Sequence, residues 1–236
     1  MNMKKIIIKT AAFATLIAGL SACGYDNFNE PESTLKGSIQ YNGQNVRVKG
    51  TGNTIQLQLY QSGYELKSPI TIFVDQDGNF STKLFNGDYK LVTKDKNGPW
   101  VNNRDTIEVK VKGNTSITVN VTPYFIISNP TCSLNGSSGS ASFNIEQVVS
   151  STTISYGYVI VGHTSLIDEQ NNDAAFQIPA SYLHTGSNTI PVTLTSEQQS
   201  SLKALYDRYK KISVRMSIRS TEASESNYSE IINLTL

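Results

Sequence analysis

The sequence contains few of the residues on which metal sites, disulfide scaffolds and catalytic centres are usually built. Its 236 residues include two histidines, two cysteines and one tryptophan, and only 17% are charged. Two histidines and two cysteines offer almost no material for a zinc site or a cysteine-rich scaffold. A formal net charge of +1 lacks the surplus of cations that nucleic-acid binding requires. We therefore expect no metal, no cofactor and no nucleic-acid partner.

The sequence also lacks the motifs of common enzyme classes. His163 and His184 both stand beside hydroxyl residues, but no Gly-x-Ser-x-Gly elbow accompanies them. Neighbouring carboxylates such as Asp168 and Glu169 are more often solvated loop residues than the acid pair of a glycosidase. We therefore predict that the protein is not an enzyme.

One acidic motif has the beginning of a calcium-binding loop. Asp75-x-Asp77-Gly78-Asn79 resembles the start of such a loop, but the twelfth position of an EF-hand, which should be glutamate, is Asn86 when counted from Asp75. A turn between two strands accounts for the same residues, because an Asp side chain can bond the backbone two residues further on. We predict such an Asx turn.

The N-terminal segment has the layout of a secretory signal peptide. Lys4, Lys5 and Lys9 precede an uncharged apolar run at residues 11–20. That run is too short to span a bilayer, which takes about 20 residues, and small residues follow it, as at a cleavage site. A buried N-terminal helix is the alternative, but it would not explain the interruption by Lys9. We predict a signal peptide at residues 1–22.

Cys23 directly follows that segment. The sequence Leu20-Ser-Ala-Cys23 resembles the lipobox of bacterial lipoproteins, which implies that Cys23 carries lipid. Each buried CH₂ of an acyl chain contributes about 0.8 kcal/mol, so several chains would anchor a polar protein to a membrane. Cleavage would remove three lysines and no acidic residue, which takes the net charge from +1 to −2. Cys132 would then lack a disulfide partner, and we predict that it is a small buried hydrophobic residue.

Residues 23–34 have the composition of a tether. They are acidic, rich in Asn, Pro and Ser, and without periodicity. Asp26, Glu30 and Glu32 resemble, in dispersed form, the acidic signal behind the lipidated cysteine of Bacteroidetes surface lipoproteins. We expect a lipid-anchored outer-membrane protein on the cell surface, with the periplasmic face as the alternative.

Hydrophobicity with a period of two runs through residues 35–122. Ile55, Leu57 and Leu59 alternate with polar residues, as in a half-buried strand. Asn86-Gly87 is a two-residue hairpin signal. No stretch of this part has helical periodicity, so we predict an all-β sandwich at 35–122.

Residues 123–236 continue the strand pattern with one interruption. In the strand around Arg215 we expect Val214 and Met216 to face inward and Arg215 to face outward. A capping box at Thr195 and apolar residues at helical spacing predict a core-packing helix within 196–211. The expected fold class is all-β, with two consecutive β-sandwich domains and one short helix near 196–211.

Several longer stretches resemble known families. Phe73–Val92 (FVDQDGNFSTKLFNGDYKLV) is similar to the prealbumin-like module related to carboxypeptidase regulatory domains. Residues 97–100 (NGPW), 105–107 (DTI) and 121–124 (VTPY) resemble a two-domain surface lipoprotein family of Bacteroidetes, the DUF3823 group. The last strands of the chain resemble those of an immunoglobulin-like or fibronectin type III sandwich.

The DUF3823 resemblance implies a role and partners. Members tend to be encoded near outer-membrane glycan-uptake pairs of the SusC and SusD type. The resemblance therefore implies a non-catalytic surface protein that captures polysaccharide or oligosaccharide beside SusC/SusD-like proteins. It does not identify the polysaccharide.

Aromatic side chains flanked by amides are the best candidates for sugar contacts, because sugars stack on aromatic faces while amides bind their hydroxyls. The candidate glycan-binding residues are Trp100, Asn102, Asn103, Arg104 and Tyr182. A second interpretation of Trp100 stays open, in which its ring packs the loop against the sheet.

Thr106 is a candidate for modification. Asp105-Thr106-Ile107 resembles the short acceptor for protein O-glycosylation in Bacteroidetes, so Thr106 is a candidate O-glycosylation site.

Together these features predict an accessory glycan-binding or scaffolding protein of a polysaccharide uptake system. Binding would be reversible, without bond breaking. The alternative is a structural adhesin or fimbria-like subunit whose sheet edges pair with other chains.

Overall fold

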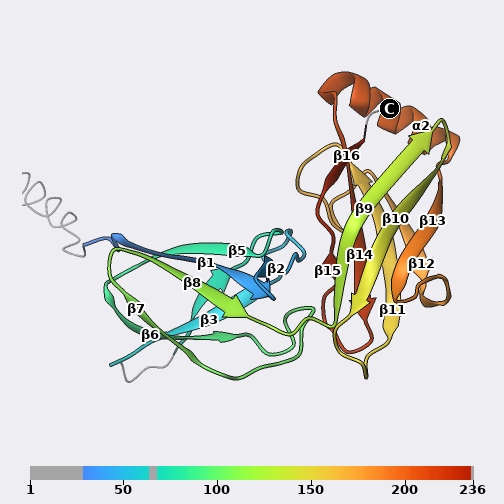
Figure 1. Ribbon diagram of the computed structural model, residues 1–236. Helices are drawn as coiled ribbons and strands as arrows, with labels where there is room; N and C mark the ends of the chain where they lie inside the picture. The colour runs from blue at the N-terminus through green and yellow to red at the C-terminus, as the bar shows by residue number, and fades with distance from the viewer. Residues whose placement is uncertain (1–28, 64–67, 235–236) are drawn as a thin grey trace, which may run out of the picture. The chain divides into compact units, whose positions relative to one another are not determined.

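β-Strands are the main regular structure of the chain, as the computed structural model shows for residues 29–63 and 68–234 (Figure 1). Residues 32–236 belong to one compact unit, and its strands form two consecutive β-sandwiches. The predicted fold class is confirmed. The predicted signal peptide at residues 1–22 and the lipid site at Cys23 lie outside the described residues. Within the described ranges, no helix is long and apolar enough to cross a membrane.

Two sheets make up the N-terminal sandwich. One contains β1 (Ser33–Tyr41), β2 (Gln44–Asn45), β5 (Asn79–Leu84) and β8 (Asn114–Asn120), and the other contains β3 (Gln56–Gln61), β4 (Ile70–Phe73), β6 (Gly87–Thr93) and β7 (Ile107–Val111). Strand β1 pairs antiparallel with β5 and parallel with β8. Alternate side chains of both sheets, such as Leu35 and Leu57, meet in one core, because successive side chains of a strand point to opposite faces.

Asn86-Gly87 does not form the predicted hairpin. Strands β5 and β6 on either side of it belong to different sheets, so the chain crosses between the sheets at this point. The Asn86 side chain accepts hydrogen bonds from Ser33 Oγ at 2.6 Å and from Gly113 N at 3.0 Å. The asparagine therefore serves as a tie between three segments and not as a hairpin turn.

The C-terminal sandwich also has two sheets. The smaller contains β9 (Phe125–Asn135), β10 (Ser138–Gln147) and β13 (Gly186–Thr193), and the larger contains β11 (Ile154–Gly162), β12 (Ala174–Pro179), β14 (Ile212–Ser220), β15 (Asn227–Tyr228) and β16 (Ile232–Leu234). Phe143 of β10 and Val214 of β14 belong to the core between these sheets. Cys132 packs partly buried against the same core, and burial raises the pKa of its thiol to about 11.

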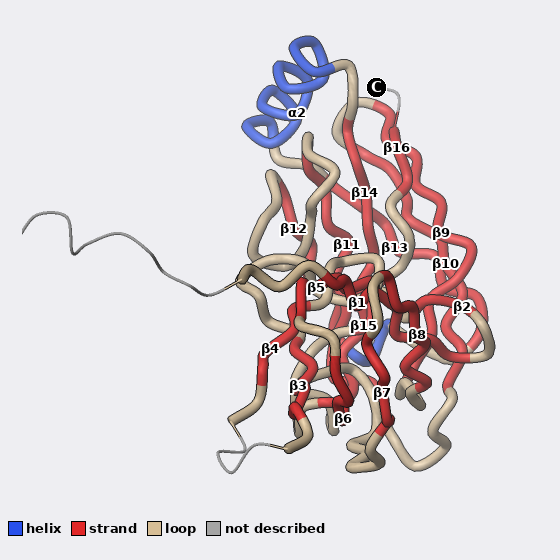
Figure 2. The backbone as a smooth tube through the Cα atoms, turned by 90° about the vertical axis from the view of Figure 1, so that its left-hand side faces the viewer, coloured by secondary structure: helices blue, strands red, loops and turns tan. Residues whose placement is uncertain are grey.

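Helix α2 (Ser196–Tyr209) lies at one end of the C-terminal sandwich (Figure 2). The predicted capping box is confirmed: Thr195 Oγ1 accepts from Gln198 N at 3.2 Å, and Gln198 Oε1 accepts from Thr195 N at 2.9 Å. Leu202 is buried in the core, as expected for a core-packing helix. A short 3₁₀ helix, η2 (Ala180–Tyr182), connects β12 to β13.

Candidate functional site: a cleft at the junction of the sandwiches

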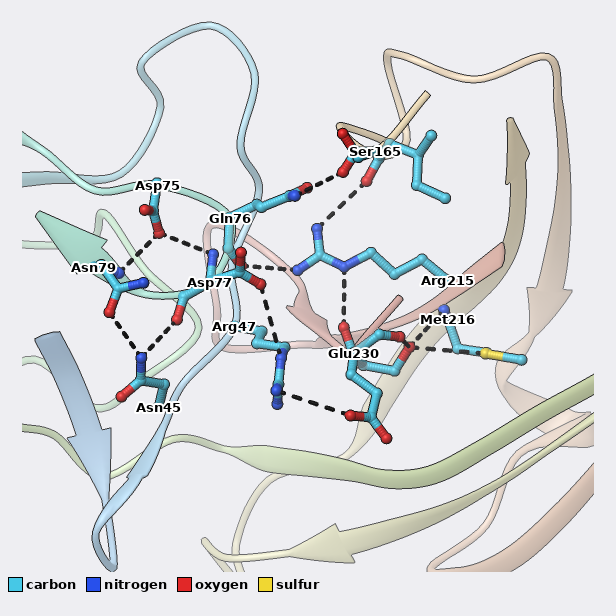
Figure 3. A network of polar contacts seen from close by, with 12 residues as sticks. Asn45, Arg47, Asp75, Gln76, Asp77, Asn79, Ser165, Arg215, Met216 and Glu230 are labelled. Carbon is cyan, nitrogen blue, oxygen red and sulfur yellow. Dashed lines mark hydrogen bonds and ion pairs between the residues drawn. The ribbon is translucent and has the colours of Figure 1, made fainter. Parts of the chain in front are cut away.

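Arg215 ties the two sandwiches together at their junction. Its side chain is 0% exposed, so the prediction that it faces outward is wrong: Ile167 and Ser229 of the C-terminal sandwich and Gln76 of the N-terminal sandwich lie against it on that face of β14. The guanidinium donates to the carbonyl oxygens of Ser229 (3.0 Å), Ile167 (3.3 Å) and Gln76 (2.9 Å) (Figure 3). Burial lowers the pKa of Arg215 to about 10, and the nearby Tyr228, with its ring centre 4.4 Å away, opposes that shift. Arg215 therefore remains charged at neutral pH.

Asp168 makes a second tie across the junction. This carboxylate is 0% exposed. One oxygen accepts from Thr51 N (3.0 Å) and Thr51 Oγ1 (2.7 Å), and the other accepts from the backbone N–H groups of Gln170 (2.9 Å) and Asn171 (3.0 Å). Burial disfavours the charged form, but these hydrogen bonds outweigh it and hold the pKa of Asp168 below its usual value.

The turn at residues 75–79 supplies the N-terminal side of the junction. Asp75 Oδ1 accepts from the N–H groups of Asp77 (2.9 Å) and Asn79 (2.8 Å), which confirms the predicted Asx turn (Figure 3). The turn presents Gln76, whose Nε2 donates to Ser165 O at 2.7 Å. In the described part of the chain, no three acidic, histidine or cysteine side chains are grouped to hold a metal ion.

A cleft of about 740 Å³ lies beside this junction, within the range of volumes typical of small-molecule sites. Both sandwiches line it. The N-terminal sandwich contributes Tyr41, Asn42, Gln44, Asn45, Arg47 and Asp77, and the C-terminal sandwich contributes Ile126, Ile127, Ser128, Asn129, Pro130, Glu146, Asn227, Tyr228 and Glu230.

A tight turn forms the N-terminal rim of the cleft. Asn42 and Gly43 both have positive φ, 50° and 78°, and the flanking residues Tyr41 and Gln44 pair across β1 and β2. Two such residues form the kind of two-residue turn that matches the twist of a β-hairpin. The hairpin therefore holds the side chains of Asn42 and Gln44 at the cleft edge.

Polar side chains without a partner of their own line the cleft. Across residues 29–63 and 68–234, no hydrogen bond or ion pair involves the side chains of Tyr41, Asn42, Gln44, Asn129 or Glu146. Three of them are amides, each with donors and an acceptor. Their hydrogen-bonding capacity is therefore available to a ligand.

Arg47, in contrast, is shared between two carboxylates. Its guanidinium lies 4.0 Å from Asp77 on the N-terminal sandwich and 4.0 Å from Glu230 on the C-terminal sandwich (Figure 3). Asn45 is also committed, since its Nδ2 donates to Asp77 O at 3.0 Å and to Asn79 Oδ1 at 2.9 Å. These residues form the wall of the cleft.

Two family models match the sandwiches described above. The DUF3823 N-terminal domain, described as a protein of unknown function, matches residues 33–122, and DUF3823_C, described as a domain of unknown function, matches residues 125–233. The chain belongs to the DUF3823 family.

Solved structures agree with this DUF3823 assignment. A DUF3823 family protein from Parabacteroides merdae is 37% identical with a TM-score of 0.80, and the match covers 88% of this chain and 100% of that one. A DUF3823 family protein from Bacteroides ovatus is 32% identical with a TM-score of 0.75, covering 86% and 99%. No curated protein matches the chain.

Trp100 does not present a sugar platform in this DUF3823 chain. Its side chain is only 4% exposed and belongs to the N-terminal core. Its backbone pairs with Pro123 in an isolated bridge, which places it where the two sandwiches connect along the chain. The prediction that Trp100 contacts a sugar is wrong, because a buried indole has no free face for a ligand. The alternative, in which the ring packs the loop against the sheet, agrees with the structure.

The polar residues beside Trp100 are exposed but already bonded within their loop. Asn102 Oδ1 accepts from Lys96 N at 2.6 Å, and Asn103 Oδ1 accepts from Asp105 N at 2.8 Å. Arg104 pairs with Asp95 at 2.6 Å. None of the three lines the cleft, so the loop holds its own shape and leaves few free groups for a sugar.

The remaining predicted residues lie apart from one another. Tyr182 of η2 is 70% exposed, and Thr106 is exposed just before β7. His163 bonds Asp173 through Nδ1 at 2.7 Å and stacks on Tyr209 with ring centres 4.9 Å apart. The structure brings none of these residues into the cleft.

Sequence reasoning missed the cleft because its lining comes from turns and outward strand faces of both halves. Two signals point to it in retrospect. Tyr41–Asn45 combines a positive-φ turn pair with polar side chains. Arg215 stands in a strand between two serines at outward positions, Ser213 and Ser217, and both serines are fully buried.

Proposed function

We propose that the protein binds carbohydrate reversibly in the junction cleft. The observation that carries this proposal is the set of unpartnered polar side chains, Tyr41, Asn42, Gln44, Asn129 and Glu146, that face one volume of about 740 Å³. Sugars present many hydroxyl groups, each a donor and an acceptor. Amides match them because they offer both donors and an acceptor, and the carboxylate of Glu146 adds further acceptors.

The shape of the cleft favours binding because it is held in place before a ligand arrives. Two hydrogen bonds cross the junction: Arg215 donates to Gln76 O, and Asp168 accepts from Thr51 Oγ1. A site that is already ordered loses less conformational entropy on binding. Ile126 and the ring of Tyr41 add apolar surface to the lining, which suits the C–H faces of sugar rings.

The fold also agrees with this proposal, although it does not carry it. A protein from Bacteroides uniformis, described as a candidate carbohydrate-binding protein, has the same fold with a TM-score of 0.64 at 16% identity, covering 87% of this chain and all of that one. At that identity the likeness concerns the fold alone. The argument for carbohydrate therefore rests on the cleft.

The wider role that we propose is that of a non-catalytic accessory component of glycan uptake, held at the outer membrane through lipid on Cys23. SusC/SusD-like proteins would be its neighbours. Replacing Cys23 by alanine should release the protein from the membrane fraction. Protease treatment of intact cells should digest the wild-type protein if it faces outward.

A glycan array followed by calorimetry tests the binding proposal. The decisive variant is Asn42→Gly with Asn129→Gly, because glycine tolerates the left-handed backbone of both positions (φ 50° and 51°). Loss of two amides, one from each sandwich, should weaken binding by about tenfold or more. The matched control is Asn102→Ala with Asn103→Ala outside the cleft, which should bind like wild type. Loss of binding in the control variant alone would refute the proposal that carbohydrate binds in the cleft.

A further inference from the structure

We infer that the junction cleft selects neutral or positively charged sugars over uronic acids and sulfated glycans, and that Glu146 determines this preference. The inference rests on the proposed function and goes beyond it by naming the class of glycan. Four charged residues line the cleft: Asp77, Glu146 and Glu230 are acidic, and Arg47 is basic. Three negative charges and one positive charge give the lining a net charge of −2.

The positive charge is not free to meet an anionic ligand. Arg47 already lies between Asp77 and Glu230, 4.0 Å from each. An anionic glycan would have to compete with both carboxylates for the same guanidinium. Arg215 does not help, because it is 0% exposed and its donors point at backbone carbonyls.

Glu146 is the one charged residue of the lining that has no ion pair in the described residues. It lies on β10 directly opposite Ile126 of β9, and both residues line the cleft. The alternation of β10 buries Ile145 and leaves Glu146 exposed. In the part of the chain that the structure describes, no ion pair or hydrogen bond involves its carboxylate.

An unpaired carboxylate acts in two ways on a bound sugar. Its oxygens accept hydrogen bonds from hydroxyl groups or from the ammonium group of an amino sugar, and such charge-assisted bonds are the stronger ones. The same charge repels a carboxylate or sulfate brought close to it, because like charges are disfavoured in a partly enclosed site. Both effects favour neutral or cationic sugars over anionic ones, and together they produce the selectivity between these classes.

The test uses three oligosaccharide series of matched length: neutral cello-oligosaccharides and xylo-oligosaccharides, cationic chitosan oligosaccharides and anionic oligogalacturonides. Calorimetry of the wild-type protein is carried out at low and at moderate salt. The affinity for the best neutral or cationic ligand should be about tenfold higher than the affinity for the anionic series. The difference should shrink as salt increases, because salt screens exposed charges.

Glu146→Gln is the critical variant, because it keeps the shape and removes the charge. It should bind the anionic series more tightly and the cationic series more weakly, so that the preference falls several-fold. Glu108→Gln is the control: Glu108 is an exposed strand residue outside the cleft lining, and its loss should leave the preference unchanged.

The outcomes separate the two proposals. Suppose that oligogalacturonides bind tightly and that the double variant Asn42→Gly with Asn129→Gly abolishes this binding. That result would overturn the inference about charge but would support carbohydrate binding in the cleft. An unchanged preference in Glu146→Gln would also overturn it. Failure of all three series and of the wider array to bind would reject the proposed function, and the inference with it.

Discussion

Buried polar groups hold the junction together at the scale of single residues. Arg215 and Asp168 are both fully buried, and neither forms an ion pair in the described residues. Hydrogen bonds to backbone groups and to Thr51 satisfy them instead. A buried charge without such bonds would cost several kcal/mol, so these bonds decide whether the junction forms.

Asp168 gives the junction a dependence on pH. Because its folded pKa lies below its unfolded value, its contribution to stability is present above the unfolded pKa and is lost as pH falls through the folded pKa. Asp168→Asn should lower the free energy of unfolding by about 2 kcal/mol at pH 7, and the gap to wild type should narrow below about pH 4. Urea denaturation at both pH values measures this.

The control for that experiment is Asp105→Asn. Asp105 is exposed, and its side chain makes no hydrogen bond in the described residues, so the variant should unfold like wild type at each pH. Glu225, whose pKa burial raises, is present in every variant and does not alter the comparison. A gap that stays constant from pH 7 to pH 3 would contradict the role given to the charge of Asp168.

Strands and the helix follow local rules at the scale of the element. The alternation in Gln56–Gln61 gives the burial pattern of a half-buried strand, and the Thr195 capping box starts α2. Thr195→Ala should destabilise the protein by about 1 kcal/mol because the backbone N–H of Gln198 loses its acceptor, Thr195 Oγ1. Thr195→Ser, which keeps the hydroxyl acceptor, should retain most of that stability in thermal or urea denaturation. Equal loss in both variants would argue against the cap.

The limits of sequence reasoning appear at the same scale. The alternation of apolar and polar residues correctly predicts that one face of β14 is apolar. The same pattern does not predict what covers the other face. Arg215 is buried there because segments distant along the chain, at Ile167 and Ser229 of its own sandwich and at Gln76 of the other, supply carbonyl groups to it. Asn86-Gly87 has the composition of a hairpin turn, yet the strands beside it pair with other partners. Local patterns predict elements, whereas the cleft depends on contacts between elements.

At the scale of the whole molecule, the central feature is that the two sandwiches are held in a fixed arrangement by the contacts at their junction. Arg215→Ala should lower the free energy of unfolding by about 3 kcal/mol, because three carbonyl groups, two of them in buried hydrogen bonds, lose their donor. It should also weaken glycan binding, since the cleft walls come from both sandwiches. Arg219→Ala on the same strand is the control: Arg219 is partly exposed, and its removal should cost less than about 1 kcal/mol. Equal losses of stability and of glycan binding in the two variants would show that Arg215 does not hold the two sandwiches together.

The most direct test of carbohydrate binding in the junction cleft is an NMR titration that follows side-chain amide signals. The titrant is the tightest neutral oligosaccharide from the array. The account predicts that the amide signals of Asn42, Gln44 and Asn129 shift together and saturably, while those of Asn102 and Asn103 stay in place. Shifts confined to Asn102 and Asn103, or no saturable shift in the cleft with a glycan that binds, would contradict it.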